Sequence, residues 1–213
     1  MVKFFESTFT ITVTPAYFLR YPNPYSTHVV SSDALSTGIN LETGNLHITR
    51  LHLKRGKLPA SVARFMPKIK ESYILEKSIV DPRSQTLKTE HRNLDWDGVL
   101  SVVENQVYAP SCPKTTDVNT VVRFESRFGR RSEVPEKRGW LGGWGAAGVQ
   151  RSIELVGRSR MRDRLQQSRE GMKIVLEQLR ERGFVDVVKE QRQGQWERWK
   201  QTQCKTELSG ANI

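Results

Sequence analysis

Few side chains in this sequence are spaced for covalent or metal chemistry. The chain contains four histidines and two cysteines, Cys112 and Cys204. His47 and His52 are five residues apart on a predicted strand, so their side chains face opposite sides of a sheet and cannot bind one metal ion. No Gly-x-Ser-x-Gly sequence and no Cys-x-x-Cys pair is present. We therefore expect no catalytic residues, no metal site and no cofactor, and a protein that is not an enzyme.

One glycine-rich segment has the spacing of a nucleotide-binding motif. Residues Gly143–Gly148 match the Gly-x-Gly-x-x-Gly pattern of dinucleotide-binding folds. In those folds the motif follows a strand directly and leads to a second parallel strand. Here a charged stretch precedes the glycines, and the predicted helix after them is too long for such a unit. We interpret residues 130–148 as a flexible Gly/Trp-rich loop.

The chain carries a large excess of positive charge. It has 34 Lys and Arg against 23 Asp and Glu, and a formal net charge of +11. This surplus favours an anionic partner, because like charges repel one another and add nothing to folding. Nucleic acid, an anionic membrane surface and a phosphorylated ligand all fit. No apolar run reaches the roughly 18 residues that a membrane-spanning helix needs.

Alternating apolar residues predict a sheet in the first two thirds of the chain. After a strand-like segment at Lys3–Thr14, the pattern recurs near residues 28–39, 46–54, 72–80, 85–92, 99–108 and 118–128. The short links between these segments permit antiparallel hairpins and leave no room for helical crossovers. The sequence therefore predicts a curved antiparallel sheet of about seven strands.

Helical spacing of apolar residues predicts three helices. A short one falls around Pro15–Arg20, a second over Gly56–Lys70, and a long one from Val149 to Arg182 that ends at Gly183. The long helix has an apolar stripe that needs a sheet face to cover. The fold class is thus α+β, with an apolar cavity between the layers. We expect one domain over residues 1–188, and a polar tail over 189–213 that need not be ordered.

A specific resemblance begins at Arg20-Tyr21-Pro22-Asn23-Pro24-Tyr25-Ser26-Thr27-His28-Val29. This segment resembles the hallmark of the PRELI-like family, phospholipid-transfer proteins of the mitochondrial intermembrane space. The likeness spans roughly residues 1–182 and continues in consistent order through Arg50-Leu51, Gly56-Lys57-Leu58-Pro59, Arg92-Asn93-Leu94-Asp95 and Ser168-Arg169-Glu170-Gly171-Met172. The first and third of these five segments look most like the phosphatidic-acid-transferring branch of the family.

The resemblance implies a lipid carrier. Such a protein would move phosphatidic acid between the mitochondrial membranes, across the intermembrane space. The sheet and the long helix would enclose a tunnel for one phospholipid, which is the expected ligand in place of a cofactor. A small helical-hairpin protein with twin cysteine pairs would bind alongside to form a heterodimer. An anionic membrane surface would be the second partner, and no nucleic-acid partner is implied.

The resemblance also implies a headgroup site formed by Arg20, His28, Lys54, Arg160, Arg164 and Gln167. Arg20 matches a buried arginine that would meet the lipid phosphate. A guanidinium suits this role because its rigid donor fork pairs with phosphate in a dry site. Gln167 stands where the phosphatidic-acid branch tends to carry a basic residue. The segment Lys57–Lys70 matches the family's lid, through Lys57, Leu58, Val62, Phe65, Met66 and Ile69.

Other interpretations remain open at this stage. A basic nucleic-acid-binding protein accounts for the charge, although the sequence lacks a recognition-helix pattern and an RNP-like motif. A family member that only acts as a scaffold for its hairpin partner accounts for the motifs. Arg20 is alternatively a surface arginine near a turn. The polar residues on the long helix are alternatively a solvated basic face, and Lys57–Lys70 a helix that packs on the sheet.

Overall fold

Seven strands form one antiparallel sheet in the order β1-β7-β6-β5-β4-β3-β2. The computed structural model describes residues 2–6, 10–56, 71–95, 100–112, 115–126 and 163–210. The strands are β1 (Val2–Glu6), β2 (Val29–Ile39), β3 (Leu46–Arg55), β4 (Glu71–Asp81), β5 (Thr86–Asn93), β6 (Leu100–Cys112) and β7 (Thr115–Ser126). The predicted sheet of about seven strands is confirmed.

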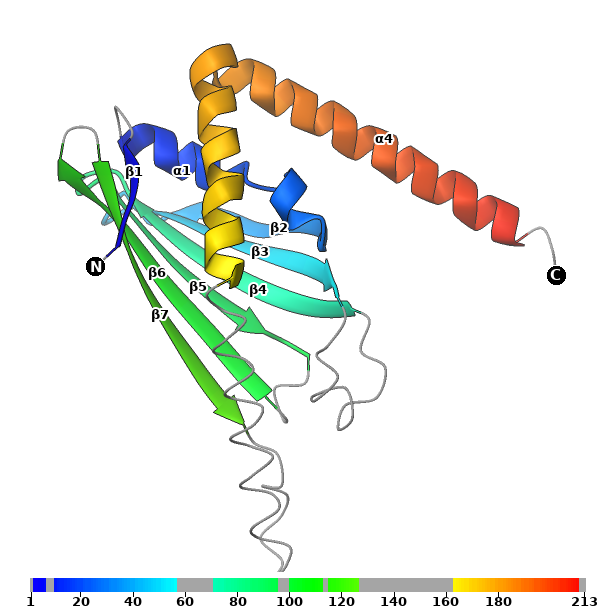
Figure 1. Ribbon diagram of the computed structural model, residues 1–213, viewed down its shortest axis with the longest axis horizontal. Helices are drawn as coiled ribbons and strands as arrows, with labels where there is room; N and C mark the ends of the chain where they lie inside the picture. The colour runs from blue at the N-terminus through cyan, green and yellow to red at the C-terminus, as the bar shows by residue number, and fades with distance from the viewer. Residues whose placement is uncertain are drawn as a thin grey trace, which may run out of the picture.

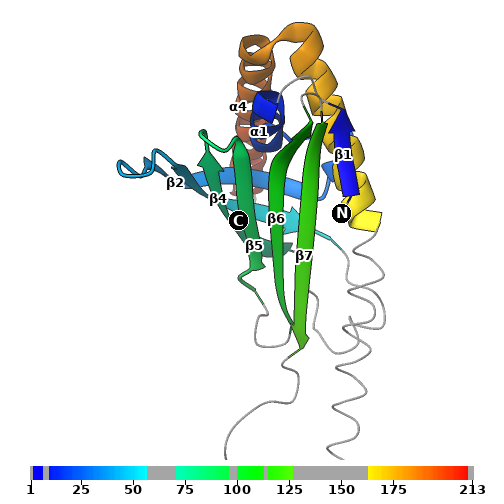
Figure 2. The same ribbon diagram turned by 90° about the vertical axis from the view of Figure 1, so that its left-hand side faces the viewer.

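Helices lie on one face of this sheet. Helix α1 (Thr10–Phe18) and the helix over residues 163–182 cross it, and a short 3-10 helix, η1 (Pro24–Ser26), follows α1 (Figure 1). Helix α4 (Phe184–Gly210) begins after Gly183 and points away from the sheet. Figure 2 shows the strong twist, with β2 and β3 running across the direction of β6 and β7. The predicted α+β class is confirmed, and the tunnel stays a prediction.

Two segments differ from what the sequence pattern indicated. The chain is helical from Thr10, where we expected a strand that continued to Thr14. In α1 the buried residues Ala16 and Tyr17 follow the buried Val13 by three and four positions, which is the spacing of one helix face. After Val188, where we expected a polar tail, the chain continues as α4. Among the described residues, no helix is long and apolar enough to cross a membrane.

The hydrophobic core lies between the sheet and the two helices that cross it. One row of the sheet, from β4 to β7, contributes Val80, Leu87, Tyr108 and Val118 in direct register. The helix over 163–182 covers this row with Met172, Val175, Leu176 and Leu179, and α1 adds Val13, Ala16 and Tyr17. An apolar row matched by two apolar helix stripes fixes both helices on this face.

Polar side chains follow this core on the same face of the sheet. The next row contains Ser78, Thr89, Gln106 and Thr120, and the row after it contains Arg50, Glu76, His91 and Glu104. Beyond them the face becomes apolar again at Ile74, Val102 and Phe124, which are half-buried. The inner face therefore has a polar band between two apolar regions, and this band positions the candidate site.

Candidate functional site

Arg20 is buried directly after α1. Only 5% of its surface is exposed, so it is not a surface arginine. Its Nη1 donates to the Tyr17 carbonyl oxygen at 2.6 Å, and its guanidinium carbon lies 3.8 Å and 4.5 Å from the ring centres of Tyr17 and Tyr21. Two aromatic rings and the end of a helix thus hold this guanidinium in one position.

Glu76 lies at the centre of a group of buried charged side chains. Its Oε2 accepts a 2.5 Å hydrogen bond from Arg20 Nη2, and its Oε1 accepts bonds of 2.8 Å and 2.6 Å from Arg50 Nε and Nη2. The Nε2 atoms of His52 and His91 each lie 3.0 Å from Oε2. We call these five residues the charge cluster. β3, β4 and β5 supply four of them from adjacent positions, and the segment after α1 supplies the fifth.

The charge cluster contains more positive than negative charge. Two arginines and one carboxylate leave one positive charge, since 2 − 1 = 1, before any contribution from the histidines. Burial alone would raise the pKa of the Glu76 carboxyl, but Arg20 and the bonds from both histidines hold that pKa well below its usual range. Glu76 is therefore ionised at neutral pH. A buried excess of positive charge is suited to bind an anion.

The two histidines of the charge cluster each have an unused nitrogen. If Nε2 donates to Glu76, then Nδ1 is left as an acceptor, and both Nδ1 atoms are buried with no hydrogen-bond partner among the described residues. Burial chiefly lowers the pKa of His52, to about 4; the hydrogen bond to Glu76 opposes this shift, and the positive charges of Arg20 and Arg50 add to it. His52 is thus neutral at pH 7, with one nitrogen free to take up a proton.

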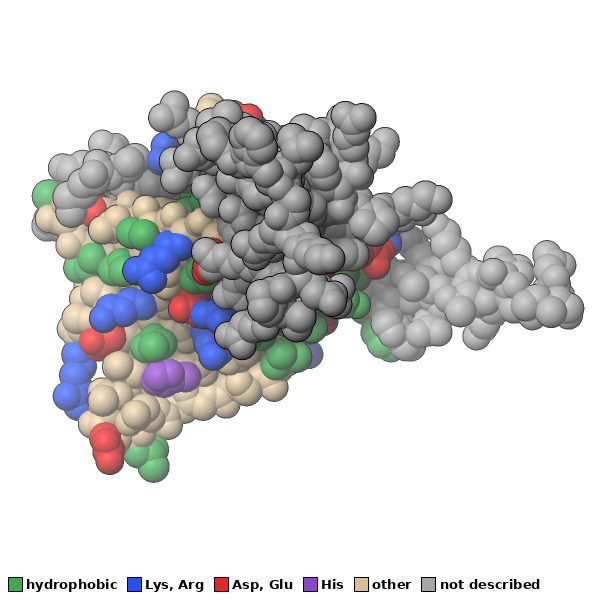
Figure 3. All heavy atoms as spheres, turned by 90° about the horizontal axis from the view of Figure 1, so that it is seen from below, with side chains coloured by type: hydrophobic (Ala, Val, Ile, Leu, Met, Phe, Trp, Pro, Cys, Tyr) green, Lys and Arg blue, Asp and Glu red, His purple; other side chains and the backbone are tan. Residues whose placement is uncertain are grey.

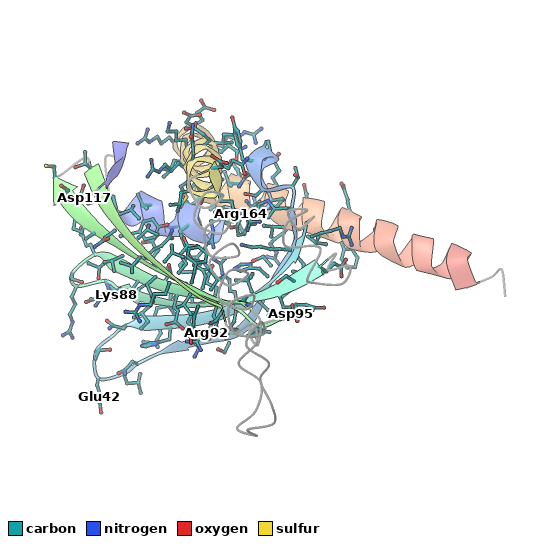
Figure 4. All side chains as sticks on the ribbon, turned by 60° about the horizontal axis from the view of Figure 1, so that its bottom comes forward. Glu42, Lys88, Arg92, Asp95, Asp117 and Arg164 are labelled. Atoms are coloured by element: carbon teal, nitrogen blue, oxygen red, sulfur yellow. The ribbon has the colours of Figure 1, made fainter. Side chains whose placement is uncertain are left out.

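A second cationic group lies beside the first. Burial lowers the pKa of His28 to about 4, and the positive charges of Lys54 and Arg164 lower it further, so these three predicted residues lie close together. Burial would raise the pKa of the Tyr21 phenol, yet Arg20 and Lys54 bring it below its usual value. Lys54 therefore acts electrostatically both on Tyr21, whose ring lies against Arg20, and on His28. Figure 4 shows Arg164 at the end of the helix that lies over the sheet.

Of the predicted headgroup residues, Arg20 is buried, His28 and Lys54 are half-buried, and Arg164 is exposed. Gln167 is exposed on the same helix as Arg164. Arg160 and the predicted lid residues Lys57, Leu58, Val62, Phe65, Met66 and Ile69 lie outside the described residues. Sequence reasoning missed Arg50, His52, Glu76 and His91 as site residues. The sequence signal that could have revealed two of them is a basic side chain at every second position of β3, at Arg50, His52 and Lys54.

Two of the motifs that carry the resemblance are in contact. Asn23, in the segment after Arg20, donates from Nδ2 to the Arg20 carbonyl oxygen at 2.5 Å and accepts from the Tyr25 amide at 2.9 Å. Its side chain lies against Gly171 of the helix over 163–182, where a Cβ atom would be 2.7 Å from both Nδ2 and Oδ1. This close approach locks the long helix to the segment that positions Arg20.

Replacing Gly171 with alanine is therefore expected to destabilise the protein. The added Cβ must displace Asn23 and its two hydrogen bonds, which costs about 1–3 kcal/mol. The better helix propensity of alanine offsets about 1 kcal/mol, so we expect a net loss of up to about 2 kcal/mol in urea unfolding. Gly38→Ala is the control, because a Cβ there has nothing within 4 Å. Equal stability of the two variants would contradict this contact.

The chemistry that the charge cluster can support follows from its side chains. Among them, no three His, Cys, Asp or Glu side chains are placed to hold a metal ion. The carboxylate of Glu76 is occupied by arginines and histidines. The arrangement can hold an anion in a buried position and exchange a proton with it.

Fold and site together define an α+β protein with a buried, positively charged cluster on the inner face of a curved sheet. The chain belongs to the PRELI-like family, whose model matches residues 11–182. It is 37% identical over 170 residues to "Protein UPS1, mitochondrial" of Saccharomyces cerevisiae, covering 79% of this chain and 87% of that protein.

Further relatives agree with this assignment. The chain is 37% identical over 172 residues to "Protein ups1 homolog" of Schizosaccharomyces pombe, covering 78% of this chain and 88% of that protein. It is 29% identical over 167 residues to "PRELI domain-containing protein 1, mitochondrial" of Homo sapiens, covering 77% and 68% of the two chains. All of α4 lies beyond the part that the family model matches, which ends at position 182.

Proposed function

We propose that this protein transfers a phospholipid, phosphatidic acid, between mitochondrial membranes across the intermembrane space, and that it is not an enzyme. Membership of the PRELI-like family supports lipid transfer, and the mitochondrial names of its relatives support the location. The observation that carries the proposal is the buried charge cluster, whose single excess positive charge suits a phosphate group with no ammonium attached.

The physical task of such a carrier is to keep two acyl chains out of water. Some thirty methylene groups at about 0.8 kcal/mol each make a penalty on the order of 20 kcal/mol. On the inner face, the half-buried side chains of Ile74, Val102 and Phe124 follow directly after the polar band. The phosphate would lie at the charge cluster, and the acyl chains would run along this apolar region.

The other predicted residues take roles around the cluster. Lys54, His28 and Arg164 would form a cationic entrance that draws the headgroup inwards, and Arg160 and Gln167 would add to it. Lys57–Lys70 would act as a lid that opens at a membrane. The small helical-hairpin protein with twin cysteine pairs would be the protein partner, and an anionic bilayer the membrane partner.

The surface gives little support to the nucleic-acid alternative. On the part of the sheet that Figure 3 shows uncovered from below, basic side chains lie among acidic and apolar ones. Tyr73, Val107 and Val121 are exposed large hydrophobic residues of this sheet. A nucleic-acid site would need a continuous basic patch that follows a phosphate backbone.

Transfer between liposomes tests the proposal. Lys54→Glu is expected to slow phosphatidic acid transfer on the order of tenfold, because it places a negative charge beside the path of the phosphate. The assay compares phosphatidic acid with phosphatidylserine, with and without the hairpin partner, and mass spectrometry counts the lipid that copurifies.

Lys88→Glu serves as the matched control, since Lys88 is an exposed strand lysine that points to the other face of the sheet (Figure 4). Both variants should unfold at nearly the same urea concentration as the original protein. No transfer and no copurified lipid with the unaltered chain would reject the carrier and leave the scaffold alternative.

A further inference from the structure

We propose that Glu76 is a built-in counter-anion that sets the net charge of the headgroup site, and thereby determines which headgroup charge the site accepts. This inference rests on the proposed function, because it takes the charge cluster to be the place where the lipid phosphate binds. Neither the sequence motifs nor the family resemblance pointed to Glu76, which lies in the middle of β4.

Glu76 holds the two arginines of the cluster unequally. Arg50 gives it two hydrogen bonds, from Nε and Nη2, and its Nη1 donates to the Phe18 carbonyl oxygen at 3.0 Å. Arg20 gives it one hydrogen bond, from Nη2. A planar guanidinium binds most strongly when both arms of its fork share one carboxylate. Both arginines are thus ion-paired with Glu76, and the cluster as a whole keeps one positive charge in excess.

The charged and titratable groups that face Glu76 come from several elements. β3 supplies Arg50 and His52, β5 supplies His91, and the segment after α1 supplies Arg20. On β6, Glu104 is the register partner of His91, and its Oε1 accepts a 2.7 Å bond from Gln106 rather than from an arginine. Tyr17 lies beside the cluster, with its hydroxyl 3.1 Å from His91 Nε2.

This arrangement has a consequence for the ligand. A headgroup with one negative charge neutralises the site, whereas a dianionic phosphate monoester leaves one negative charge in excess. The buried Nδ1 atom of His52 has no partner among the described residues, so this imidazole can take up the compensating proton. The site therefore accepts a phosphate monoanion, or a dianion that brings a proton. A zwitterionic headgroup would place its ammonium beside Arg20 and Lys54.

Changing the charge of the site tests this role. Glu76→Gln keeps the shape of the side chain and raises the site charge by one. We expect it to bind phosphatidic acid with eight-carbon chains about tenfold more tightly or better, because the repulsion between carboxylate and phosphate is gone. Arg50→Gln lowers the charge by one and should weaken binding by a similar factor. Calorimetry measures the affinity, and circular dichroism establishes that each variant is folded.

A matched pair separates charge from loss of structure. Arg50→Lys disturbs the same fork as Arg50→Gln but keeps the charge, so it should weaken binding clearly less than Arg50→Gln does. If the Glu76→Gln variant does not fold, the comparison of Arg50→Lys with Arg50→Gln still tests the inference. Equal weakening by Arg50→Lys and Arg50→Gln, or weaker binding by a folded Glu76→Gln variant, would overturn the inference.

The unaltered protein provides an independent measurement. Binding of the eight-carbon phosphatidic acid at pH 8, where the free lipid is largely dianionic, is expected to take up about one proton. Calorimetry in two buffers of different ionisation enthalpy counts that proton. Binding without proton uptake would overturn the inference and leave the carrier function intact. Absence of binding would instead reject the proposed function itself.

Discussion

Replacing Arg20 with glutamate is expected to unfold the protein at physiological temperature, and not merely to stop ligand binding. The new carboxylate would face Glu76, which is fully buried, in place of the 2.5 Å ion pair found there. Breaking one buried ion pair costs about 3–5 kcal/mol, and two adjacent buried carboxylates add to this. The total free energy of unfolding of a single domain is only about 5–15 kcal/mol. Thermal unfolding followed by circular dichroism measures the loss.

The control for this prediction is an exposed arginine. Arg123 lies on β7 and is exposed, so Arg123→Glu should change the unfolding free energy by about 0.5 kcal/mol or less. If Arg20→Glu unfolds at the same temperature as Arg123→Glu, then Arg20 is not paired with Glu76 in solution.

Acidification from pH 7 to pH 4 is expected to remove much of the protein's stability. His52 has a folded-state pKa of about 4, below its ordinary value of 6.5, so between these values the unfolded chain binds a proton that the folded chain does not. Stability therefore falls as the pH decreases through this window, by about 3 kcal/mol for a shift of this size. His28 has the same direction of shift and adds to the loss.

Below this window Glu76 becomes the important group. Its folded-state pKa is depressed, so its contribution is present above the ordinary carboxyl pKa and decreases as the pH falls below it. Urea unfolding at several pH values between 7.5 and 4 measures how steeply the free energy of unfolding depends on pH. The variant His52→Gln keeps a donor for Glu76 and cannot titrate, so its slope should be smaller. His47→Gln, at an exposed position, should retain the full slope. Identical slopes in both variants would exclude His52 as the source.

The sheet was predictable because its signal is local. Short turns between alternating segments leave few topologies, and strands expected at residues 46–54 and 72–80 occupy Leu46–Arg55 and Glu71–Asp81. The start of α1 was misjudged because Ile11 and Val13 also fit an alternating pattern, and a few residues cannot distinguish the two periods. Helix α4 was missed because its sequence is almost entirely polar and lacks the apolar stripe that predicts a helix.

The charge cluster could not be predicted because β3 reverses the usual pattern. Along this strand the leucines at 51 and 53 alternate with Arg50 and His52, so a simple reading places the leucines inside. The structure instead buries Arg50 and His52 and leaves both leucines half-buried on the other face. Only the pairing with Glu76 from β4 makes this orientation stable, and that partner is 26 residues away from Arg50.

The topology also constrains when this protein can fold. The first strand pairs with the last, at Val2 and Val118, and Asn23 packs against Gly171. Closing such long loops has a large entropic cost that is offset only once both ends are present. In a chain that emerges amino terminus first, β1 and the segment around Asn23 therefore wait for distant native partners, whereas β2 to β7 can pair with consecutive neighbours. The contact that joins the segment around Asn23 to the helix over residues 163–182 can therefore form only after the last third of the chain has arrived.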